Sequence, residues 1–299
     1  MDFLRLLSEH KLIVGDGAMG SQLMARGLPP GAAGEIWNVE RPDVVEAVHR
    51  EYVEAGADYV LTNSFAGNGV ALAKHKLADR LEEVNTAAVE IARRAAGDKV
   101  AVLGGLGSTG ELLEPLGEMT ESQAREGFAA QVRALADAGV DGFLAETFES
   151  SAELRIALST VREVSDLPLL ASMKFNPEPG GTYHSMMGET PEQLVAVAHE
   201  TSCIAVGTNC GHGIATMVAL VAQISALTKL PVLCEPNAGV PALVNGKTVY
   251  KDTPAVFRRH LAKLYNAGAR IIGGCCGTTG KHIQAVRAFA DRLEQGAAP

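Results

Sequence analysis

Eight short apolar runs recur along the chain and end at glycine or polar residues. They span residues 12–17, 59–65, 100–107, 142–148, 168–175, 204–210, 231–239 and 270–277. The apolar residues in each run follow one another instead of alternating with polar residues, which is typical of strands buried on both faces. The pattern therefore predicts eight strands of a parallel sheet.

The segments between these runs carry the periodicity of amphipathic helices. In residues 42–57, one stripe of apolar side chains lies opposite charged residues. The stripe consists of Val44, Val45, Val48, Tyr52 and Val53. Residues 122–140, 190–200 and 253–269 follow the same plan, and a last helix is expected at 281–294. Three of these segments end in Ala-Gly-Ala or Ala-Gly-Val, which supplies a glycine where a helix stops.

Strands and helices that alternate in this number predict a (β/α)8 TIM barrel, formed as a single α/β domain by residues 1–299. A doubly wound sheet is the alternative. The longest irregular stretch, residues 176–189, follows the fifth strand, and we expect it to cover the active site as a lid.

Composition and charge narrow the classes of function. The formal charge of −9 argues against a surface that neutralises phosphates, so no nucleic-acid partner is expected. Five irregularly spaced cysteines favour a reducing, cytoplasmic compartment over a disulfide scaffold. The first residues lack the pattern of a signal peptide. The longest uncharged run, residues 201–228, is interrupted by glycines and polar residues, so no membrane span is expected.

Three of the five cysteines are expected at one end of the barrel. Cys210 ends the sixth run, and Cys275 and Cys276 lie at the end of the eighth. Because the carboxyl ends of barrel strands form one face, these thiols should converge there. Three thiolates with one open position are a ligand set that zinc prefers. Alternatively, the adjacent residues Cys275 and Cys276 could be small buried hydrophobic residues or form a vicinal disulfide. The remaining two cysteines, Cys203 and Cys234, are expected to pack as small hydrophobic residues.

Two other motifs suggest different chemistry. Residues 105–110, Gly-Leu-Gly-Ser-Thr-Gly, match a dinucleotide fingerprint, but Pro115 and Gly117 follow where a long helix should run. We therefore expect this loop to approach a small ligand instead. Lys174 at a strand end could form a Schiff base, as in an aldolase, but that chemistry leaves the three cysteines unexplained.

The motifs at the strand ends resemble those of a known family. They are Gly-Asp-Gly-Ala-Met-Gly-Ser (15–21), Glu-Thr-Phe (146–148), Gly-Thr-Asn-Cys-Gly (207–211), Pro-Asn-Ala-Gly-Val-Pro (236–241) and Gly-Gly-Cys-Cys-Gly-Thr-Thr (273–279). Together they resemble the zinc-dependent homocysteine S-methyltransferases. That family includes betaine– and S-methylmethionine–homocysteine methyltransferases and the homocysteine module of cobalamin-dependent methionine synthase. The resemblance extends over residues 10–290.

The resemblance implies a (β/α)8 fold and transfer of a methyl group to the thiol of homocysteine, which gives methionine. It also implies the residues of the site. Cys210, Cys275 and Cys276 are expected to bind zinc. Asp16 and Glu146 are expected to bind the amino group of homocysteine, and the amides of Gly17 and Ala18, with Ser64, its carboxylate. Asn209 is expected in the same substrate site.

The methyl donor is less constrained by these motifs. Residues 35–43 resemble the segment of the betaine and S-methylmethionine enzymes that carries a tryptophan of the donor pocket. The corresponding residue here is Trp37, and a cationic donor would bind over the face of its ring. The chain ends at residue 299 without folate and cobalamin modules. We therefore expect a small onium donor such as betaine or a sulfonium. One alternative is that a separate methyl-corrinoid protein is the donor. Another is that the chain is a non-catalytic zinc-binding barrel that docks such a partner. The sequence is also compatible with a homo-oligomer.

Overall fold

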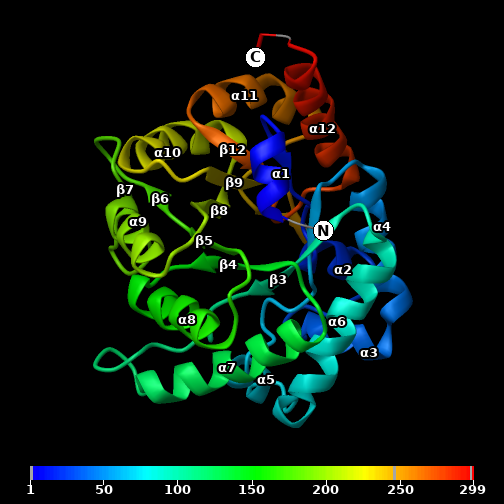
Figure 1. Ribbon diagram of the computed structural model, residues 1–299, viewed down its shortest axis with the longest axis vertical. Coiled ribbons are helices and arrows are strands. Elements are labelled where there is room, and N and C mark those ends of the chain that lie inside the picture. Colours follow the sequence, from blue (N-terminus) through cyan, green and yellow to red (C-terminus); the bar gives the residue numbers. More distant parts are fainter. Residues whose placement is uncertain (1–2, 245–246, 297) are drawn as a thin grey trace.

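The computed structural model describes residues 3–244, 247–296 and 298–299. Its main sheet consists of β1 (Ile13–Val14), β2 (Tyr59–Leu61), β3 (Ala101–Leu106), β4 (Gly142–Phe148), β5 (Leu169–Met173), β8 (Ala205–Gly213), β9 (Val232–Asn237) and β12 (Ala269–Ile272). The strands pair in parallel in the order β1-β12-β9-β8-β5-β4-β3-β2. They form a ring in chain order, surrounded by helices (Figure 1).

Asp58 closes the ring between β1 and β2. Its N–H donates to the Val14 carbonyl at 2.7 Å, and its carboxylate accepts from the Val14 N–H at 2.7 Å. The sheet is therefore a (β/α)8 barrel, which confirms the predicted fold and excludes the doubly wound alternative.

Helices cover the outside of the barrel (Figure 1). They are α2 (Gly20–Ala25), α3 (Trp37–Glu40), α4 (Pro42–Glu54), α5 (Gly69–Ala73), α6 (Leu81–Ala96), α7 (Glu121–Asp137), α8 (Ser151–Val164), α9 (Pro191–Glu200), α10 (Ile214–Leu227), α11 (Pro254–Asn266) and α12 (Gly280–Glu294). The five predicted helices correspond to α4, α7, α9, α11 and α12. At the start of α7, Thr120 and Gln123 form a reciprocal capping box, which satisfies two free N–H groups. Among the described residues, no helix is both long and apolar enough to cross a lipid bilayer.

Apolar side chains fill the barrel at the amino ends of its strands. The buried cluster there includes Phe3, Ile13, Tyr59, Leu103, Leu144, Leu170, Leu233 and Ile271. Phe3 belongs to α1 (Phe3–Glu9), which lies across the middle of the barrel in Figure 1. Its ring meets that of Tyr59 edge-on, with 5.7 Å between centroids. This end of the barrel is therefore closed, and a site can form only at the carboxyl ends.

Two short hairpins lie outside the predicted strands. β6 (Asn176–Pro177) pairs with β7 (Tyr183–His184) inside segment 176–189, and β10 (Ala242–Val244) pairs with β11 (Lys247–Val249) after β9. Strands of two or three residues are too short to show an alternating pattern in the sequence. The lid function of segment 176–189 stays a prediction.

Candidate active site

A cavity of about 440 Å³ lies at the carboxyl ends of the strands. Its walls include most of the residues predicted from the sequence: Asp16, Gly17, Ala18, Ser64, Glu146, Cys210, Cys275 and Cys276. These residues come from the ends of β1, β2, β4, β8 and β12, so elements far apart in the chain supply one site. Asn209 and Trp37 are not among the lining residues.

The three cysteines of the predicted metal site lie side by side in this cavity. Their Sγ atoms are all within 4.8 Å of one another, and those of Cys210 and Cys276 are 4.0 Å apart. Zinc–sulfur bonds of about 2.3 Å place tetrahedral sulfurs about 3.8 Å apart, so the group needs only a small contraction to hold zinc. Each of the five cysteines is a free thiol, and Cys203 and Cys234 are buried in the apolar core. The three thiols therefore fit a soft, tetrahedral metal ion.

Unusual backbone conformations bend the chain at the thiols. Cys210 has a φ of +63°, a left-handed conformation that costs a residue other than glycine about 1–2 kcal/mol. Gly211 and Gly277, which follow the cysteines, have φ values of +76° and +80°. The pairing of β8 with β9 is irregular between Asn209 and Gly213. A strained residue retained at a predicted ligand position is typical of a functional site.

Hydrogen bonds among the thiols concentrate negative charge on one sulfur. Contacts from Cys275 and Cys276 lower the pKa of Cys210 to about 3. The contact with Cys210 raises the pKa of Cys276 to about 11, and it raises the pKa of Cys275 well above the usual range. A metal bound by all three sulfurs must displace the remaining protons, so metal affinity should increase with pH.

Four carboxyl groups line the same cavity, and three of them, those of Asp16, Glu146 and Glu235, lie at strand ends. Burial raises the pKa of Asp16 and Glu146 well above the usual range and that of Glu235 to about 7. Asp16 Oδ2 accepts the Leu61 N–H at 2.9 Å, and Glu235 Oε1 accepts the Tyr59 O–H at 2.7 Å. Among the described residues that line the cavity, none is a lysine or an arginine. The carboxyl groups therefore suit a cationic ligand.

We expect Glu235→Gln to reduce the dependence of stability on pH. Because the folded state raises this pKa from 4.5 to about 7, protonated Glu235 favours folding, and that contribution is lost as pH rises through about 7. Glutamine stays neutral and can still accept from Tyr59. The melting temperature should therefore fall less between about pH 4.5 and about pH 7 than in the parent protein, as calorimetry can measure. The exposed Glu54→Gln is the control, and parallel profiles of Glu235→Gln and the parent would contradict this expectation.

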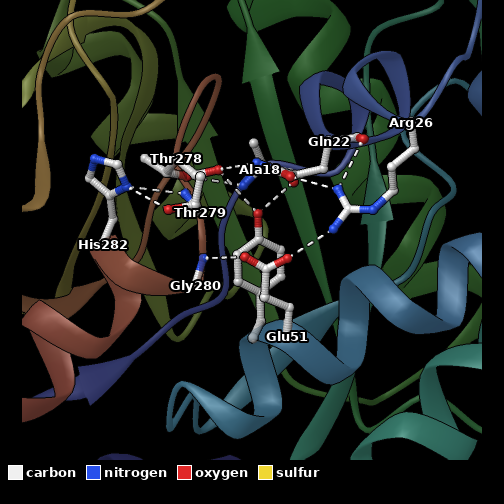
Figure 2. Close-up of polar contacts among 9 residues, drawn as sticks. Ala18, Gln22, Arg26, Glu51, Thr278, Thr279, Gly280 and His282 are labelled. Atoms are coloured by element: carbon white, nitrogen blue, oxygen red, sulfur yellow. Dashed lines mark hydrogen bonds and ion pairs between the residues drawn. The ribbon is translucent and has the colours of Figure 1, made fainter.

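A network of hydrogen bonds joins the loop after β1 to the turn that carries the adjacent cysteines. The Ala18 N–H donates to Thr278 Oγ1 at 3.1 Å (Figure 2), and that hydroxyl donates to the Cys275 carbonyl at 2.7 Å. The Tyr52 hydroxyl donates to the Ala18 carbonyl at 2.7 Å, and Gln22 donates to the Thr278 carbonyl at 2.8 Å. The amide of Ala18, predicted to bind a carboxylate, is therefore already bonded within the protein.

Glu51 on α4 extends this network to two further elements (Figure 2). Its carboxylate accepts from Arg26 at 2.9 Å and from the N–H of Gly280, the first residue of α12, at 3.0 Å. At the same helix start, the N–H of Thr279 donates to Nδ1 of His282 at 3.2 Å. Helix α12 follows the cysteine turn directly, so these contacts fix the thiols as well as the helix.

Asn209 lies outside the cavity lining and joins three strand ends. Its side chain donates to Thr147 Oγ1 at 2.6 Å and accepts from the Thr147 N–H at 2.9 Å and from Ser172 Oγ at 2.7 Å. The same amide nitrogen is 3.3 Å from Glu146 Oε2 and 3.9 Å from Cys275 Sγ. Asn209 thus orients groups around the cavity, and its predicted contact with a substrate stays a prediction.

Trp37 is not among the residues that line the cavity. Its side chain is buried at the start of α3, and the Arg41 guanidinium lies 5.1 Å from its ring centroid. A cation of this chain therefore already lies over this ring, and the predicted contact of Trp37 with a donor stays a prediction. Ser64 does line the cavity, and its hydroxyl donates to the Gly105 carbonyl at 2.8 Å.

The two alternative motifs contact protein groups. In loop 105–110, the Ser108 hydroxyl donates to the Glu153 carboxylate at 2.8 Å, so an acidic side chain lies where a dinucleotide phosphate would bind. Lys174 forms an ion pair with Glu149 at 2.8 Å, so its Nζ is held by a protein carboxylate. Neither motif supports its alternative chemistry.

The structure adds three residues to the site. Glu235 is visible in the sequence as a polar residue at a strand end, but its position beside the other carboxyl groups is not. Thr278 lies within the cysteine motif, but nothing in the sequence indicates that its hydroxyl accepts a hydrogen bond from Ala18. The Tyr250 ring packs against Gly277, directly after Cys276, and no pattern in the sequence marks Tyr250.

Comparisons with known proteins agree with this chemistry. The family described as Homocysteine S-methyltransferase matches residues 13–290. The methionine synthase of Mycobacterium tuberculosis is 34% identical over 98% of this chain and 26% of its own length. That of Mycobacterium leprae is 32% identical over 100% of this chain and 26% of its own length. The chain thus spans about a quarter of the length of the curated relatives it matches.

A solved structure shares the fold. The homocysteine methyltransferase MmuM from Escherichia coli, in its metallated form, superimposes with a TM-score of 0.80 at 24% identity. The alignment covers 97% of this chain and 100% of that chain, so the two barrels correspond over their whole length.

Proposed function

The chain belongs to the homocysteine S-methyltransferase family, and from this premise we propose that it transfers a methyl group to the thiol of homocysteine, giving methionine, at a zinc-dependent site. The observation that carries the proposal is the meeting of three thiols and the three strand-end carboxyl groups in one cavity. The thiols suit a soft metal ion, and the carboxyl groups suit an ammonium group. An amino acid with a thiol side chain fits both sets.

Cys210, Cys275 and Cys276 are the proposed zinc ligands. A free thiol has a pKa of about 8.5 and is mostly protonated at neutral pH. Zinc, when bound, supplies a cationic centre that keeps a coordinated thiol deprotonated. The separations of the three sulfurs support this assignment, and three protein ligands leave one tetrahedral position for the sulfur of a substrate.

The carboxyl groups are proposed to bind the ammonium group of homocysteine, with Asp16 and Glu146 as the first acceptors and Glu235 as a third. Their raised pKa values reflect burial without a cation, and a bound ammonium would favour their ionised forms. The Gly17 amide at the glycine turn is proposed for the substrate carboxylate. The bonded amide of Ala18 holds this loop in shape.

A small onium compound, such as betaine or a sulfonium, is the proposed donor. Met24 and Phe65 line a more exposed part of the cavity, with 46% and 41% of their surfaces accessible. Met19, Leu28 and the Glu35 carboxyl group line the same cavity. An aromatic ring and a carboxyl group beside apolar side chains suit a methylated cation, which supports this donor.

A methyl-corrinoid protein is the alternative donor. The relatives at 34% and 32% identity are both named methionine synthase, and the motifs resemble the homocysteine module of the cobalamin-dependent enzyme, which favours this alternative. A barrel that binds zinc and docks a corrinoid partner without turnover is the third candidate.

One assay separates these candidates. The zinc-loaded protein is incubated with homocysteine and, in parallel, with betaine, S-methylmethionine, dimethylsulfoniopropionate or methylcobalamin, and methionine is measured. We expect methionine from an onium donor, and none after removal of the metal by a chelator. Methionine from methylcobalamin alone would replace the onium donor by a corrinoid, and zinc binding without methionine from any donor would favour the non-catalytic barrel.

Three broader expectations stay predictions. They are a cytoplasmic location, a single homocysteine-binding domain over residues 1–299, and assembly into a homo-oligomer. Light scattering coupled to size-exclusion chromatography measures the last of these.

A further inference from the structure

Thr147, which follows Glu146 on β4, has a strained backbone. Its φ is +62°, and among the described residues it is the only β-branched residue with a positive φ. Such a conformation is a genuine outlier for a β-branched side chain. The pairing of β4 with β5 shifts between Ala145 and Phe148, so the strand bends here. Neighbouring side chains of a regular strand lie on opposite faces, but at this bend both Glu146 and Thr147 line the cavity.

Asn209 on β8 holds this bend. Its Oδ1 accepts the Thr147 N–H at 2.9 Å, and its Nδ2 donates to Thr147 Oγ1 at 2.6 Å. The Ser172 hydroxyl on β5, the strand between β4 and β8, donates to the same Oδ1 at 2.7 Å. Asn209 and Ser172 are both fully buried. A strained backbone persists only where its surroundings fix it, and this amide binds both the main chain and the side chain of the strained residue.

The same amide connects the carboxyl groups of the candidate site with its thiols. Its Nδ2 lies 3.3 Å from Glu146 Oε2 and 3.9 Å from Cys275 Sγ. Along the chain, Asn209 directly precedes Cys210, whose φ is +63°. Asn209 is therefore bonded to one strained residue and adjacent to another. The first follows a carboxyl group proposed to bind an ammonium group, and the second is a proposed zinc ligand.

We propose that Asn209 is a positioning residue that fixes the spacing between Glu146 and the three thiols, an inference that rests on the proposed function. An amino thiol that binds Glu146 through its ammonium group and the zinc site through its sulfur must span that spacing. Homocysteine has two methylene groups between its α-carbon and its sulfur, whereas cysteine has one. A fixed spacing therefore selects homocysteine over the shorter amino thiol, because a misplacement of about 1 Å is costly at such a site.

The test is Asn209→Ala, with calorimetric titration of the zinc-loaded full chain by homocysteine, cysteine and 3-mercaptopropionate. The Kd for homocysteine should rise by about 10- to 100-fold, because Glu146 is no longer held in place. The preference for homocysteine over cysteine should decrease. The Kd for 3-mercaptopropionate, which has no ammonium group, should stay within about twofold of the parent value. In a Glu146→Gln background, Asn209→Ala should change the Kd for homocysteine by less than about twofold, because Asn209 acts through Glu146.

Thr147→Ala tests the same contact without emptying a fully buried position. It removes the hydroxyl that accepts from Asn209, and it should raise the Kd for homocysteine by roughly 3- to 10-fold. Asn85→Ala is the matched control. Asn85 is also a buried asparagine, and it donates to the carbonyls of Gly67 and Leu81, outside the cavity lining. This variant should keep the parent's preference among the three thiols.

Two results would overturn the role of Asn209 alone. One is parent-like binding of homocysteine by both folded variants, Asn209→Ala and Thr147→Ala. The other is an equal loss of affinity for all three thiols in Asn209→Ala, which indicates a general structural role. Melting curves show whether each variant is folded, and Thr147→Ala decides if Asn209→Ala does not fold. Absence of homocysteine binding by the zinc-loaded parent would overturn the proposed function, and the role of Asn209 with it.

Discussion

Cys210→Ala should lose its zinc and methylate homocysteine about 10³-fold more slowly or worse, because a metal ion contributes several kcal/mol to the activation of a substrate. The Sγ atoms of the three cysteines lie within 4.8 Å of one another, so each can supply one corner of the same ligand set. Two thiols at Cys275 and Cys276 cannot hold zinc as tightly as three. Metal content by mass spectrometry and methionine formation measure the two effects.

Cys203→Ala is the control for this prediction. Cys203 is buried and lies outside the group of three thiols, so its replacement removes a cysteine without touching the site. This variant should keep about one zinc per chain and the parent rate. Full zinc occupancy in Cys210→Ala would contradict the assignment of the ligands.

The second large effect is expected from Asp16→Asn. The change removes a negative charge but keeps an oxygen that can accept the Leu61 N–H. Loss of a charged hydrogen bond costs roughly 1.5–3 kcal/mol, so the KM for homocysteine should rise by about 10- to 100-fold. Glu146→Gln should have an effect of the same direction. Steady-state kinetics measure both, with zinc content as the check that the metal site is intact.

A thiol without an amino group, such as 3-mercaptopropionate, is the control substrate for these variants. It offers no ammonium to Asp16 or Glu146, so its kcat/KM should be similar in the variants and the parent. A parent-like KM for homocysteine in both variants would contradict the proposed role of the two carboxyl groups.

The barrel and the group of thiols could be predicted from the sequence because both depend on the ends of strands. Parallel strands in a closed ring bring their carboxyl ends to one face. A residue at the carboxyl end of a predicted strand can therefore be assigned to that face from the sequence. Cys210, Cys275, Asp16 and Glu146 were predictable for this reason. The position of Glu235 at a strand end was visible as well, but its proximity to the other carboxyl groups depends on barrel geometry.

Contacts made by loops could not be predicted in the same way. The bond between Ala18 and Thr278 joins residues that are 260 positions apart, and it uses the amide expected to bind a substrate. Trp37 follows a 3-10 turn that directs it into the core, where Arg41 covers its ring. Tyr250 follows two strands of three residues each, and such short strands leave no periodic trace.

The closed amino end of the barrel has a kinetic consequence. Because Phe3 and the apolar cluster fill that end, reactants reach the carboxyl groups only through the opposite mouth. Asp16 and Glu235 are only 3% and 2% exposed, whereas Phe65 in the same cavity is 41% exposed. A donor bound beside Phe65 would cover an amino acid bound at the carboxyl groups. Homocysteine must then bind before the donor, and methionine can leave only after the demethylated donor has departed.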